Sequence, residues 1–467
     1  MEDTFRSLPL APAILEAAAS LGYERMTPIQ AKAIPALLAG QDLIGQSQTG
    51  SGKTVAFGVP LLQRVDLDTR AMQALVLCPT RELSAQVARE LRKLGGGLKG
   101  LHVLVVAGGE PLRGQAAALE RGVHIVVGTP GRVGDHLQRG NLELSRLRSV
   151  VLDEADRMLD MGFADEMQFI LDELPRARQT VLFSATFPDN IEALSRRYQR
   201  KPERITIEAA PAERLNIVEQ VITVEQADKP AALRATLADH PHESALIFAN
   251  MKASVAAIEQ ALSSAGVSVA CLHGDLEQRD RDAVLAKFRN ASVRVLIATD
   301  VAARGIDVES LELVVNYDLP PKPENYVHRI GRTGRAGKQG SAVSFASPRE
   351  SAKLAAIEEL TGRPLSRVPF KPGARLEANA SGQGLAREAK MTTLKIGGGR
   401  KQKVRPGDIL GALTGEAGGL AGSDVGKIEI HDNFSYVAVA TSASRAALKS
   451  LGSGRIKGKR FVVTLVK

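Results

Sequence analysis

The chain has 467 residues, 44% of them hydrophobic, which is enough for about three domains of ordinary globular composition. It has no run of about 18 uncharged apolar residues and begins with the polar segment MEDTFRS, so we expect a cytoplasmic protein, neither secreted nor inserted in a membrane. Residues 391–467 hold 13 lysines and arginines against 5 acidic residues, a net charge of +8 out of +9 for the whole chain. This asymmetry predicts that the C-terminal segment binds a polyanion.

Short apolar runs typical of β-strands alternate with longer helix-like stretches from about residue 40 to residue 345. They read DLIG, ALVLCPT, HVLVVAGG, HIVVGTP, VVLDEAD and VLFSAT before a polar break, and ALIFAN, VACLHG, RVLIATD, LVVNYD and SAVSFA after it. Strands separated by helices imply parallel sheets built from β-α-β units, one on each side of the break. The predicted organisation is an α/β domain at 1–207, a linker at 208–214, a second α/β domain at 215–366, a polar linker at 367–390 and a small domain at 391–467.

The small C-terminal domain is predicted to run strand, helix, strand, strand, helix, strand, the order of an RNA-recognition-like α+β domain. Its elements are TLKI, a helix opened by Pro406, KIEI, SYVAVA, a helix at AALKSL and RFVVTLV. Phe434 and Tyr436 lie on one central strand, where aromatic rings could stack on unpaired bases, whereas Lys395 takes the place of an aromatic on the other. We therefore expect loop or helix contacts to replace part of the stacking.

Two glycine-flanked basic clusters in this domain, GGGRKQKVRPGD and GSGRIKGKR, are the strongest candidates for phosphate contacts. A solvated charge run is the ordinary explanation for such clusters, but this domain concentrates nearly all of the chain's excess charge. The residues predicted to bind RNA here are Arg400, Lys401, Lys403, Arg405, Arg455, Lys457, Lys459 and Arg460.

A phosphate-binding loop is predicted where the first apolar run, DLIG, leads into GQSQTGSGKT and a helix. Glycines permit a tight loop whose N–H groups face phosphate, while Lys53 reaches the β- and γ-phosphates and Thr54 holds Mg²⁺. The usual first glycine of the motif is replaced by Ser47, and a simple glycine-rich turn is the alternative explanation. The residues predicted to bind ATP in this loop are Ser47, Thr49, Gly50, Ser51, Gly52, Lys53 and Thr54.

The acidic half of the same site is predicted at SVVLDEAD, because a carboxylate at the carboxyl end of a parallel strand can face the same Mg²⁺. Asp153 is expected to bind the metal through water, and Glu154 to orient and deprotonate the attacking water. Asp156 is expected to pair locally. Taken alone, such a cluster is more often a solvated helix start, but it follows a buried strand and Lys53 precedes it in the chain.

These motifs, together with Ser184-Ala185-Thr186 and HRIGRTGR, closely resemble those of the DEAD-box RNA helicases over roughly residues 5–350. In that family the first position of the phosphate loop is not glycine, so Ser47 is a mild departure. The resemblance implies two tandem RecA-like domains, ATP and Mg²⁺ as cofactors, RNA as partner, and an RNA-stimulated ATPase that unwinds RNA. It also implies that closing arginines from the second domain act as arginine fingers.

The resemblance assigns further roles residue by residue. Phe5 and Gln30 resemble the adenine clamp, and Gly305 and Asp307 the nucleotide-facing part of ATDVAARGID. The coupling residues are Ser184 and Thr186, expected to bond to the Asp153 loop, and His328; the arginine fingers are Arg332 and Arg335. Strand-exit turns, helix caps and surface ion pairs are the structural alternatives for many of these positions. The residues that resemble RNA contacts are Pro79, Thr80, Arg81, Gly109, Thr129, Pro130, Gly131, Arg132, Gly274, Arg279, Thr299 and Asp300.

The C-terminal domain resembles that of the bacterial DbpA group in RPGDILGALTGEAG, DVGKIEIHDNFSYVAV and RIKGKRFVV. This resemblance implies binding to 23S ribosomal RNA and action on pre-50S particles in large-subunit assembly. We expect a monomer, with neither DNA nor a membrane as partner. Two alternatives stay open: a DNA translocase, and an RNA clamp without turnover, against which Glu154, Arg332 and Arg335 argue.

Overall fold

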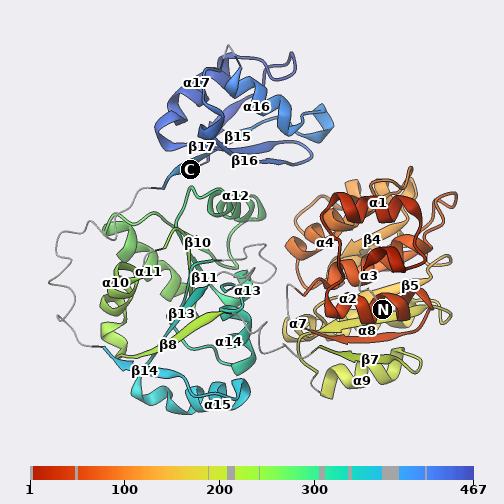
Figure 1. Ribbon diagram of the computed structural model, residues 1–467, viewed down its shortest axis with the longest axis horizontal. Helices are drawn as coiled ribbons and strands as arrows, with labels where there is room; N and C mark the ends of the chain where they lie inside the picture. The colour runs from red at the N-terminus through yellow and green to blue at the C-terminus, as the bar shows by residue number, and fades with distance from the viewer. Residues whose placement is uncertain are drawn as a thin grey trace. The chain divides into compact units, whose positions relative to one another are not determined.

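A computed structural model of the chain describes residues 4–47, 51–187, 189–207, 216–240, 242–303, 311–334, 339–370, 389–415 and 418–466. Contacts between residues divide the chain into two compact units (Figure 1). Of the described residues, those from 4 to 207 form one unit, and those from 216 to 466 form the other. No helix in the described ranges is both long enough and apolar enough to cross a membrane.

The first unit is built on a seven-stranded sheet in the order β3-β4-β2-β5-β6-β1-β7, with every neighbouring pair parallel. Its strands are β1 (Leu43–Gln46), β2 (Ala74–Leu77), β3 (Val103–Val106), β4 (Ile125–Gly128), β5 (Ser149–Leu152), β6 (Gln179–Ser184) and β7 (Glu203–Thr206). Its helices are α1 (Pro12–Ser20), α2 (Pro28–Leu38), α3 (Lys53–Arg64), α4 (Arg81–Leu94), α5 (Leu112–Glu120), α6 (Pro130–Gln138), α7 (Ala155–Asp160), α8 (Ala164–Glu173) and α9 (Asp189–Tyr198).

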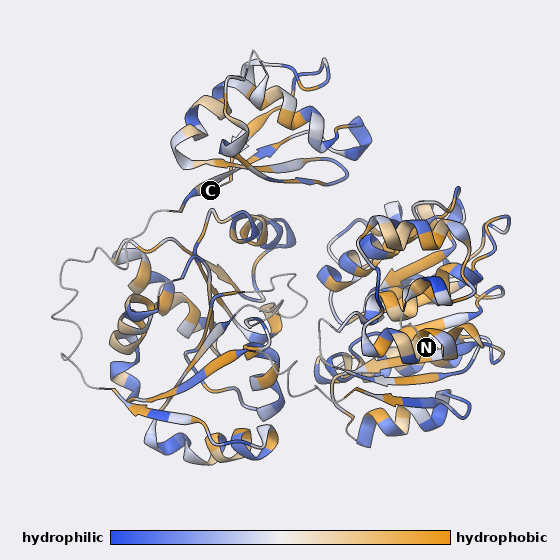
Figure 2. Ribbon diagram, viewed as in Figure 1, coloured by the Kyte–Doolittle hydropathy of each residue, from blue (hydrophilic) through white to orange (hydrophobic). Residues whose placement is uncertain are grey.

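Apolar side chains cover both faces of this sheet, which explains why its strands read as continuous apolar runs. On β2, Val76 belongs to one buried cluster and Leu75 and Leu77 to another, because successive residues of a strand point to opposite faces. Figure 2 shows apolar colour along the strands, while the helices also carry hydrophilic residues. Because both faces of the sheet are covered by apolar side chains, polar side chains of a site can gather only at the ends of the strands, and the predicted motifs lie at the carboxyl ends.

The second unit contains a seven-stranded sheet in the order β10-β11-β9-β12-β13-β8-β14, again with parallel pairs. Numbered from its own first strand, this order is the same as in the first unit. Its strands are β8 (Ile217–Thr223), β9 (Ala245–Phe248), β10 (Val269–Leu272), β11 (Val295–Ala298), β12 (Leu313–Asn316), β13 (Gly340–Ala346) and β14 (Ser366–Pro369). Its helices are α10 (Lys229–Asp239), α11 (Lys252–Ser264), α12 (Gln278–Arg289), α13 (Asp300–Ala303), α14 (Pro323–Ile330) and α15 (Ser351–Thr361).

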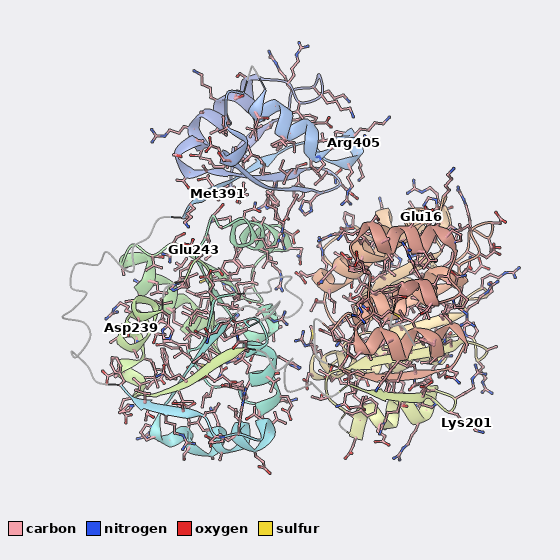
Figure 3. All side chains as sticks on the ribbon, viewed as in Figure 1. Glu16, Lys201, Asp239, Glu243, Met391 and Arg405 are labelled. Atoms are coloured by element: carbon pink, nitrogen blue, oxygen red, sulfur yellow. The ribbon has the colours of Figure 1, made fainter. Side chains whose placement is uncertain are left out.

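The C-terminal domain is a four-stranded antiparallel sheet in the order β16-β17-β15-β18. Its strands and helices follow one another along the chain in the predicted order: strand, helix, strand, strand, helix, strand. The chain passes through β15 (Met391–Ile396), α16 (Pro406–Thr414), β16 (Val425–Ile430), β17 (Ser435–Ala440), α17 (Ser444–Ser453) and β18 (Val463–Leu465). Figure 3 labels Met391 at the start of β15 and Arg405, just before α16. Two parallel-sheet domains followed by a small α+β domain are the architecture expected from the sequence.

Some predicted boundaries differ from the structure. Strand β14 runs to Pro369 and pairs with β8, so the second sheet extends beyond residue 366, where the sequence predicted the domain to end. The strands β7, β8 and β14 were not among the predicted runs. The predicted linker at 208–214 and most of the linker at 367–390 lie outside the described residues.

Candidate active site and nucleic-acid interface

The phosphate loop connects the end of β1 with the start of α3, as the sequence predicts. Gly52 has φ of +91°, and a Cβ there would lie 2.3 Å from Nε2 of Gln30, so a side chain would be strained and would clash. Lys53, the first residue of α3, is 7% exposed, and its Nζ donates to the carbonyl oxygen of Ser47 at 3.1 Å. The ammonium therefore folds back along the loop at the N-terminus of a helix, where anions are favoured. Thr49 and Gly50 lie outside the described residues.

Gln30 and Phe5, the predicted adenine clamp, are both buried. Oε1 of Gln30 accepts from the backbone N–H of Thr27, and its Nε2 donates to the carbonyl of Gly52 at 3.1 Å. The carboxamide thus connects the start of α2 with the phosphate loop. Phe5 is 3% exposed and packs in the core of the first unit. Sequence reasoning missed these supporting contacts, and the reading of adenine by Gln30 and Phe5 stays a prediction.

Asp153, directly after β5, is a buried carboxylate with an unused acceptor. It is 3% exposed, and its Oδ1 has no hydrogen-bond partner among the described residues. Burial raises the pKa of Asp153 to about 6, and the positive charge of Lys53 opposes this rise. A buried polar atom without a partner is costly, so this oxygen fits a water bound to Mg²⁺. In the described part of the chain, no group of three or more acids, histidines or cysteines is placed to hold a metal ion.

Glu154 stands in a strained conformation at the start of α7. Its φ is +55°, in the left-handed region that residues with a side chain rarely adopt, and such strain is found at functional sites. It is 6% exposed, and its carboxylate accepts from NH1 of Arg157 at 2.8 Å. This left-handed backbone conformation occurs two residues after the end of β5 and sets the direction of the Glu154 side chain, next to Asp153.

Asp156 joins the acidic loop to the end of β6. Its Oδ2 accepts from the backbone N–H groups of Ala185 and Thr186 and from Oγ1 of Thr186, at 2.9–3.2 Å. Thr186 is therefore bonded to Asp156, in the first turn of α7, and Asp156 is not confined to the local pairing that the sequence predicted. The prediction that Ser184 bonds to the Asp153 loop is wrong, because its hydroxyl donates to the carbonyl of Thr186 at 2.6 Å and so stabilises the turn itself.

The predicted RNA contacts of the first unit follow β2, β3 and β4, which lie together on one side of β5. Arg81, after β2, donates to the carbonyl of Gly108 at 3.2 Å, and Arg132, after β4, donates to that of Glu110 at 2.9 Å. Both arginines hold the glycine turn that follows β3, in which Gly109 has φ of +81°. The remaining predicted contacts follow β2 and β4: Pro79, Thr80, Thr129, Pro130 and Gly131.

The carboxyl edge of the first sheet is thus divided into two halves. The phosphate loop and the SAT turn follow β1 and β6, on one side of β5, and the predicted RNA motifs follow β2, β4 and β3 on the other. Asp153 and Glu154, at the end of β5, stand between the halves. One rigid sheet therefore holds both sets of groups.

The second unit repeats this arrangement for its own predicted RNA contacts. Gly274 follows β10, and Thr299 and Asp300 follow β11, the pair of strands equivalent to β3 and β4. The guanidinium of Arg329, a residue absent from the sequence prediction, binds both carboxylate oxygens of Asp300 at 2.6 and 2.7 Å. Arg279 is largely exposed at the start of α12.

Predicted nucleotide-facing residues of the second unit lie on or after α14 and in the segment after α13. His328 is in the last turn of α14, and Arg332, 6% exposed, follows the helix. Gly305, Asp307 and Arg335 lie outside the described residues.

In the C-terminal domain the two basic clusters lie close together, because the end of β15 pairs with the start of β18. Nζ of Lys457 donates to the carbonyl of Lys403 at 3.1 Å, which joins one cluster to the other. The cations predicted to bind phosphate are all exposed: Arg400, Lys401, Lys403, Arg405, Arg455, Lys457, Lys459 and Arg460. They form one basic surface, which is called the loop cluster below.

The predicted stacking surface on the C-terminal sheet is not available as expected. Tyr436 is 1% exposed and contacts the rings of His431 and Phe434 edge to face. Phe434 is partly buried, with the ammonium of Lys395 4.7 Å from its ring centre and His431 stacked on it at 4.5 Å. The rings therefore pack on one another, and the prediction that Tyr436 stacks on a base is wrong for this structure.

Two parallel sheets of identical strand order, the first with a phosphate loop and an acidic strand end, define an ATPase with two RecA-like domains. The chain matches the family descriptions DEAD/DEAH box helicase at residues 27–194, helicase conserved C-terminal domain at residues 228–337 and DbpA RNA binding domain at residues 393–465. It is 49% identical over 98% of both chains to the ATP-dependent RNA helicase DbpA of Escherichia coli (strain K12).

Other relatives share the core. The DEAD-box ATP-dependent RNA helicase CshA of Bacillus cereus is 46% identical over 78% of this chain and 69% of its own. The structure of Saccharomyces cerevisiae Dbp5 bound to RNA and ADP BeF3 is similar with a TM-score of 0.72 and 32% identity, over 82% of this chain and all of that one. The chain therefore belongs to the DEAD-box ATP-dependent RNA helicases, with a C-terminal RNA-binding domain of the DbpA type.

Proposed function

We propose that this ATP-dependent RNA helicase is anchored by its C-terminal domain to 23S ribosomal RNA and remodels neighbouring RNA helices during assembly of the large ribosomal subunit. The C-terminal match to the DbpA RNA binding domain and the 49% identity to the Escherichia coli helicase of that name support this assignment. Anchoring raises the local concentration of RNA at the helicase core without new contacts in the core. The chain acts as a monomer in the cytoplasm, on pre-50S particles.

In the ATP site, Thr54 and, through a water, Asp153 would hold Mg²⁺. Lys53 binds the β- and γ-phosphates, and the loop N–H groups around Gly52 surround them. The unused Oδ1 of Asp153 supports the water-mediated role. The metal supplies charge neutralisation for the leaving phosphate.

Hydrolysis requires a base from the first unit and cations from the second. Glu154 orients and deprotonates the attacking water, and Arg332 and Arg335 stabilise charge on the transferred phosphoryl group. Such arginines contribute about 10³ to 10⁵ in rate. Because ATP and RNA both favour the arrangement that completes the site, RNA stimulates the ATPase.

The core grips one RNA strand through phosphate and 2′-OH contacts, which carry little base information. The strand-end motifs of both sheets supply these contacts, among them Arg81, Arg132, Gly274, Thr299 and Asp300. The gripped strand is bent, which breaks local pairing, so unwinding is short-range and non-processive. RNA is preferred to DNA because the 2′-OH is part of the contact.

In the C-terminal domain the loop cluster, rather than the sheet, binds RNA. Its eight cations are exposed, whereas the ring of Tyr436 is buried. Each phosphate contact contributes to affinity through the release of counterions.

The division of the first sheet's carboxyl edge carries this proposal: nucleotide groups follow β1 and β6, RNA groups follow β2, β3 and β4, and the acidic end of β5 lies between. RNA binding and hydrolysis therefore share one rigid element. The assignment to ribosome assembly depends on the C-terminal domain alone.

The test compares the full chain with a chain lacking residues 391–467. ATP hydrolysis is measured with fragments of 23S ribosomal RNA, an unrelated RNA of matched length, and DNA of the same sequence. The full chain should respond to the lowest concentration of one 23S fragment and hardly to DNA, and the shortened chain should treat both RNAs alike. Equal stimulation of the full chain by RNA and DNA, or by both RNAs, would overturn the assignment.

A further inference from the structure

A pocket of about 390 Å³ lies on the first unit and has no part in the site described above. Its wall is formed by α9, by the turn after α9 and by β7, and Ile44 of β1 also lines it. Lys201, labelled in Figure 3, lies in this turn. None of the described residues that line the pocket belongs to a predicted ATP or RNA motif. Its volume is within the range of about 300 to 1,000 Å³ that is usual for sites of small molecules.

The side chains around the pocket come from two adjacent elements. Glu192, Arg196 and Gln199 follow one another at intervals of four and three residues on α9 and directly after it, the spacing that places side chains on one helix face. Arg204 of β7 lies beside Ile44 in the parallel register of β7 and β1, so both side chains point to the same face of the sheet. Helix and sheet thus present their side chains to one hollow.

The pocket is positively charged. The three cations that line it, Arg196, Lys201 and Arg204, are all exposed, and Glu192 is the one acidic residue among the described lining residues. The Glu192 carboxylate is shared, because it lies 3.1 Å from the guanidinium of Arg196 and 3.7 Å from that of Arg204. Three cations and one carboxylate leave the described lining residues with a net charge of +2.

The sequence concentrates the positive charge of the first domain in the same place. Residues 195–207 contain five lysines and arginines against one acidic residue, whereas residues 1–194 contain 20 against 23. A domain that is otherwise slightly acidic therefore has one strongly basic stretch, and this stretch forms the wall of the pocket. Such a local field raises the concentration of anions at the surface.

Some of the side chains around the pocket are held in place by other groups, which distinguishes it from a cluster of free surface cations. The guanidinium carbon of Arg204 lies 4.6 Å from the centre of the Phe187 ring. Nε2 of Gln199 donates to the carbonyl oxygens of Leu43 and Thr180 at 2.9 and 2.8 Å, which fixes the end of α9 to β1 and β6. Oε1 of Gln199 is buried and has no hydrogen-bond partner among the described residues, so an acceptor is left at the wall of the pocket.

We propose that this pocket binds a terminal phosphate group. A phosphate monoester carries a charge of about −1.5 to −2 at pH 7, which matches the charge of the pocket better than a single carboxylate or an internal phosphodiester does. Arginine binds phosphate oxygens through two parallel N–H groups, and the pocket offers two arginines and a lysine. The phosphate belongs either to a small phosphorylated molecule or to the 5′ end of an RNA strand. This site is independent of the proposed function.

The experiment titrates the full chain, with ¹³C-labelled isoleucine methyl groups, with inorganic phosphate at constant ionic strength. The methyl signal of Ile44, which lines the pocket, should shift and saturate. Arg204→Gln and Arg196→Gln should each raise the dissociation constant about tenfold, because each removes a charge-assisted hydrogen bond. Glu192→Gln should lower it about threefold, because the competing carboxylate is removed. A shift that does not saturate, or a wild-type dissociation constant for Arg204→Gln, would overturn the inference.

Two controls locate the bound phosphate. Arg146→Gln changes an exposed arginine of the same unit outside the pocket and should bind as the wild type does. Lys53→Ala removes the cation of the phosphate loop and should leave the Ile44 response unchanged. Loss of the response in Lys53→Ala would place the phosphate in the loop and contradict the proposal. The pocket variants should fold, because the side chains of Arg196 and Arg204 are 77% and 51% exposed.

Two RNA oligonucleotides of the same sequence distinguish the sources of the phosphate. If RNA with a 5′-phosphate shifts the Ile44 signal at a lower concentration than RNA with a 5′-hydroxyl, the ligand is an RNA end. If the two RNAs act alike while inorganic phosphate still binds, the ligand is a small phosphorylated molecule. Both results support the site. An Ile44 signal that responds to neither inorganic phosphate nor the 5′-phosphorylated RNA would show that the pocket binds no phosphate.

Discussion

The two RecA-like domains have the same strand order, yet the polar groups at their central strands are in opposite states. After β5 of the first domain, Asp153 is 3% exposed with one oxygen that has no hydrogen-bond partner among the described residues. At the equivalent strand β12 of the second domain, Asn316 and the carbonyl of Asp318 both accept from Arg329, whose five donors are all used. One buried polar group therefore keeps an oxygen without a partner, whereas the other uses all of its donors.

The comparison also separates two uses of burial. Burying a charge is costly, and at Asp153 this cost raises the pKa even though the positive charge of Lys53 opposes the rise. At Arg329 the cost is offset by two short bonds to Asp300 and three further acceptors. Four predictions test the residues of the two domains and of the loop cluster, from the largest expected effect to the smallest.

Arg332→Ala should have the largest effect. We expect the kcat of RNA-stimulated ATP hydrolysis to fall by about 10³-fold or more, because in the proposed function Arg332 stabilises charge on the transferred phosphoryl group. Phosphate release is measured at saturating ATP and RNA. Arg349→Ala, an exposed arginine of the same domain, is the control and should keep its activity. A loss of less than about tenfold would remove Arg332 from the reaction.

Glu154→Gln should reduce kcat by about 10² to 10⁴ while ATP still binds, because the amide keeps the shape of the side chain but cannot take a proton. Rapid-mixing measurements of the chemical step together with equilibrium binding of a fluorescent ATP analogue separate the two effects. Glu173→Gln, at the exposed end of α8, should behave as the wild type. Normal turnover in Glu154→Gln would show that another group is the base.

Asp153→Asn should stabilise the metal-free protein above pH 6 while it abolishes ATP hydrolysis. Because the folded-state pKa of Asp153 is raised to about 6, its charged form opposes folding above that pH. The amide removes this penalty, on the order of 3 kcal/mol at pH 8, and the difference should fall below about 1 kcal/mol near pH 4, where folded Asp153 is protonated. Urea unfolding in EDTA at both pH values measures it, with the exposed Asp165→Asn as control. A lower free energy of unfolding for Asp153→Asn than for the wild type at pH 8 would show that the charged form of Asp153 does not oppose folding.

Lys459→Gln should have the smallest effect, because it removes one exposed cation of the loop cluster. The slope of log affinity for RNA against log salt should become shallower by about 0.7 to 0.9, the value for one phosphate contact. Fluorescence anisotropy at several salt concentrations measures the slope. Lys99→Gln, an exposed lysine of the first domain, should leave it unchanged. An unaltered slope for Lys459→Gln would place the phosphate contacts elsewhere in the C-terminal domain.

Apolar runs identified the central strands of both sheets because these strands are buried on both faces. Edge strands gave a weaker signal: of β7 only Ile205 is buried, and β14 is exposed throughout. The rule that carboxylates after apolar strands mark a site led to Asp153 and Glu154. The same rule, widened to polar side chains and applied to LVVNYD, would have pointed to Asn316 and Asp318.

Side-chain partners could not be predicted in the same way. Arg329 stands in HRIGRTGR among other arginines, and nothing in that local pattern says which one is buried. Tyr436 alternates correctly for a stacking residue, but in the structure its ring is buried and contacts His431 and Phe434 edge to face. Ser184 and Thr186 have similar hydroxyls, and only the turn between them decides which one reaches Asp156.

The most direct test of the contrast between the two domains is a structure of the full chain with Mg²⁺, a non-hydrolysable ATP analogue and single-stranded RNA. The account predicts that Oδ1 of Asp153 accepts from a metal-bound water and that the Arg332 guanidinium reaches the nucleotide. Arg329 should keep its bonds to Asp300 and Asn316. An Asp153 oxygen that is still unpaired, or an Arg332 side chain that points away from the phosphates, would contradict it.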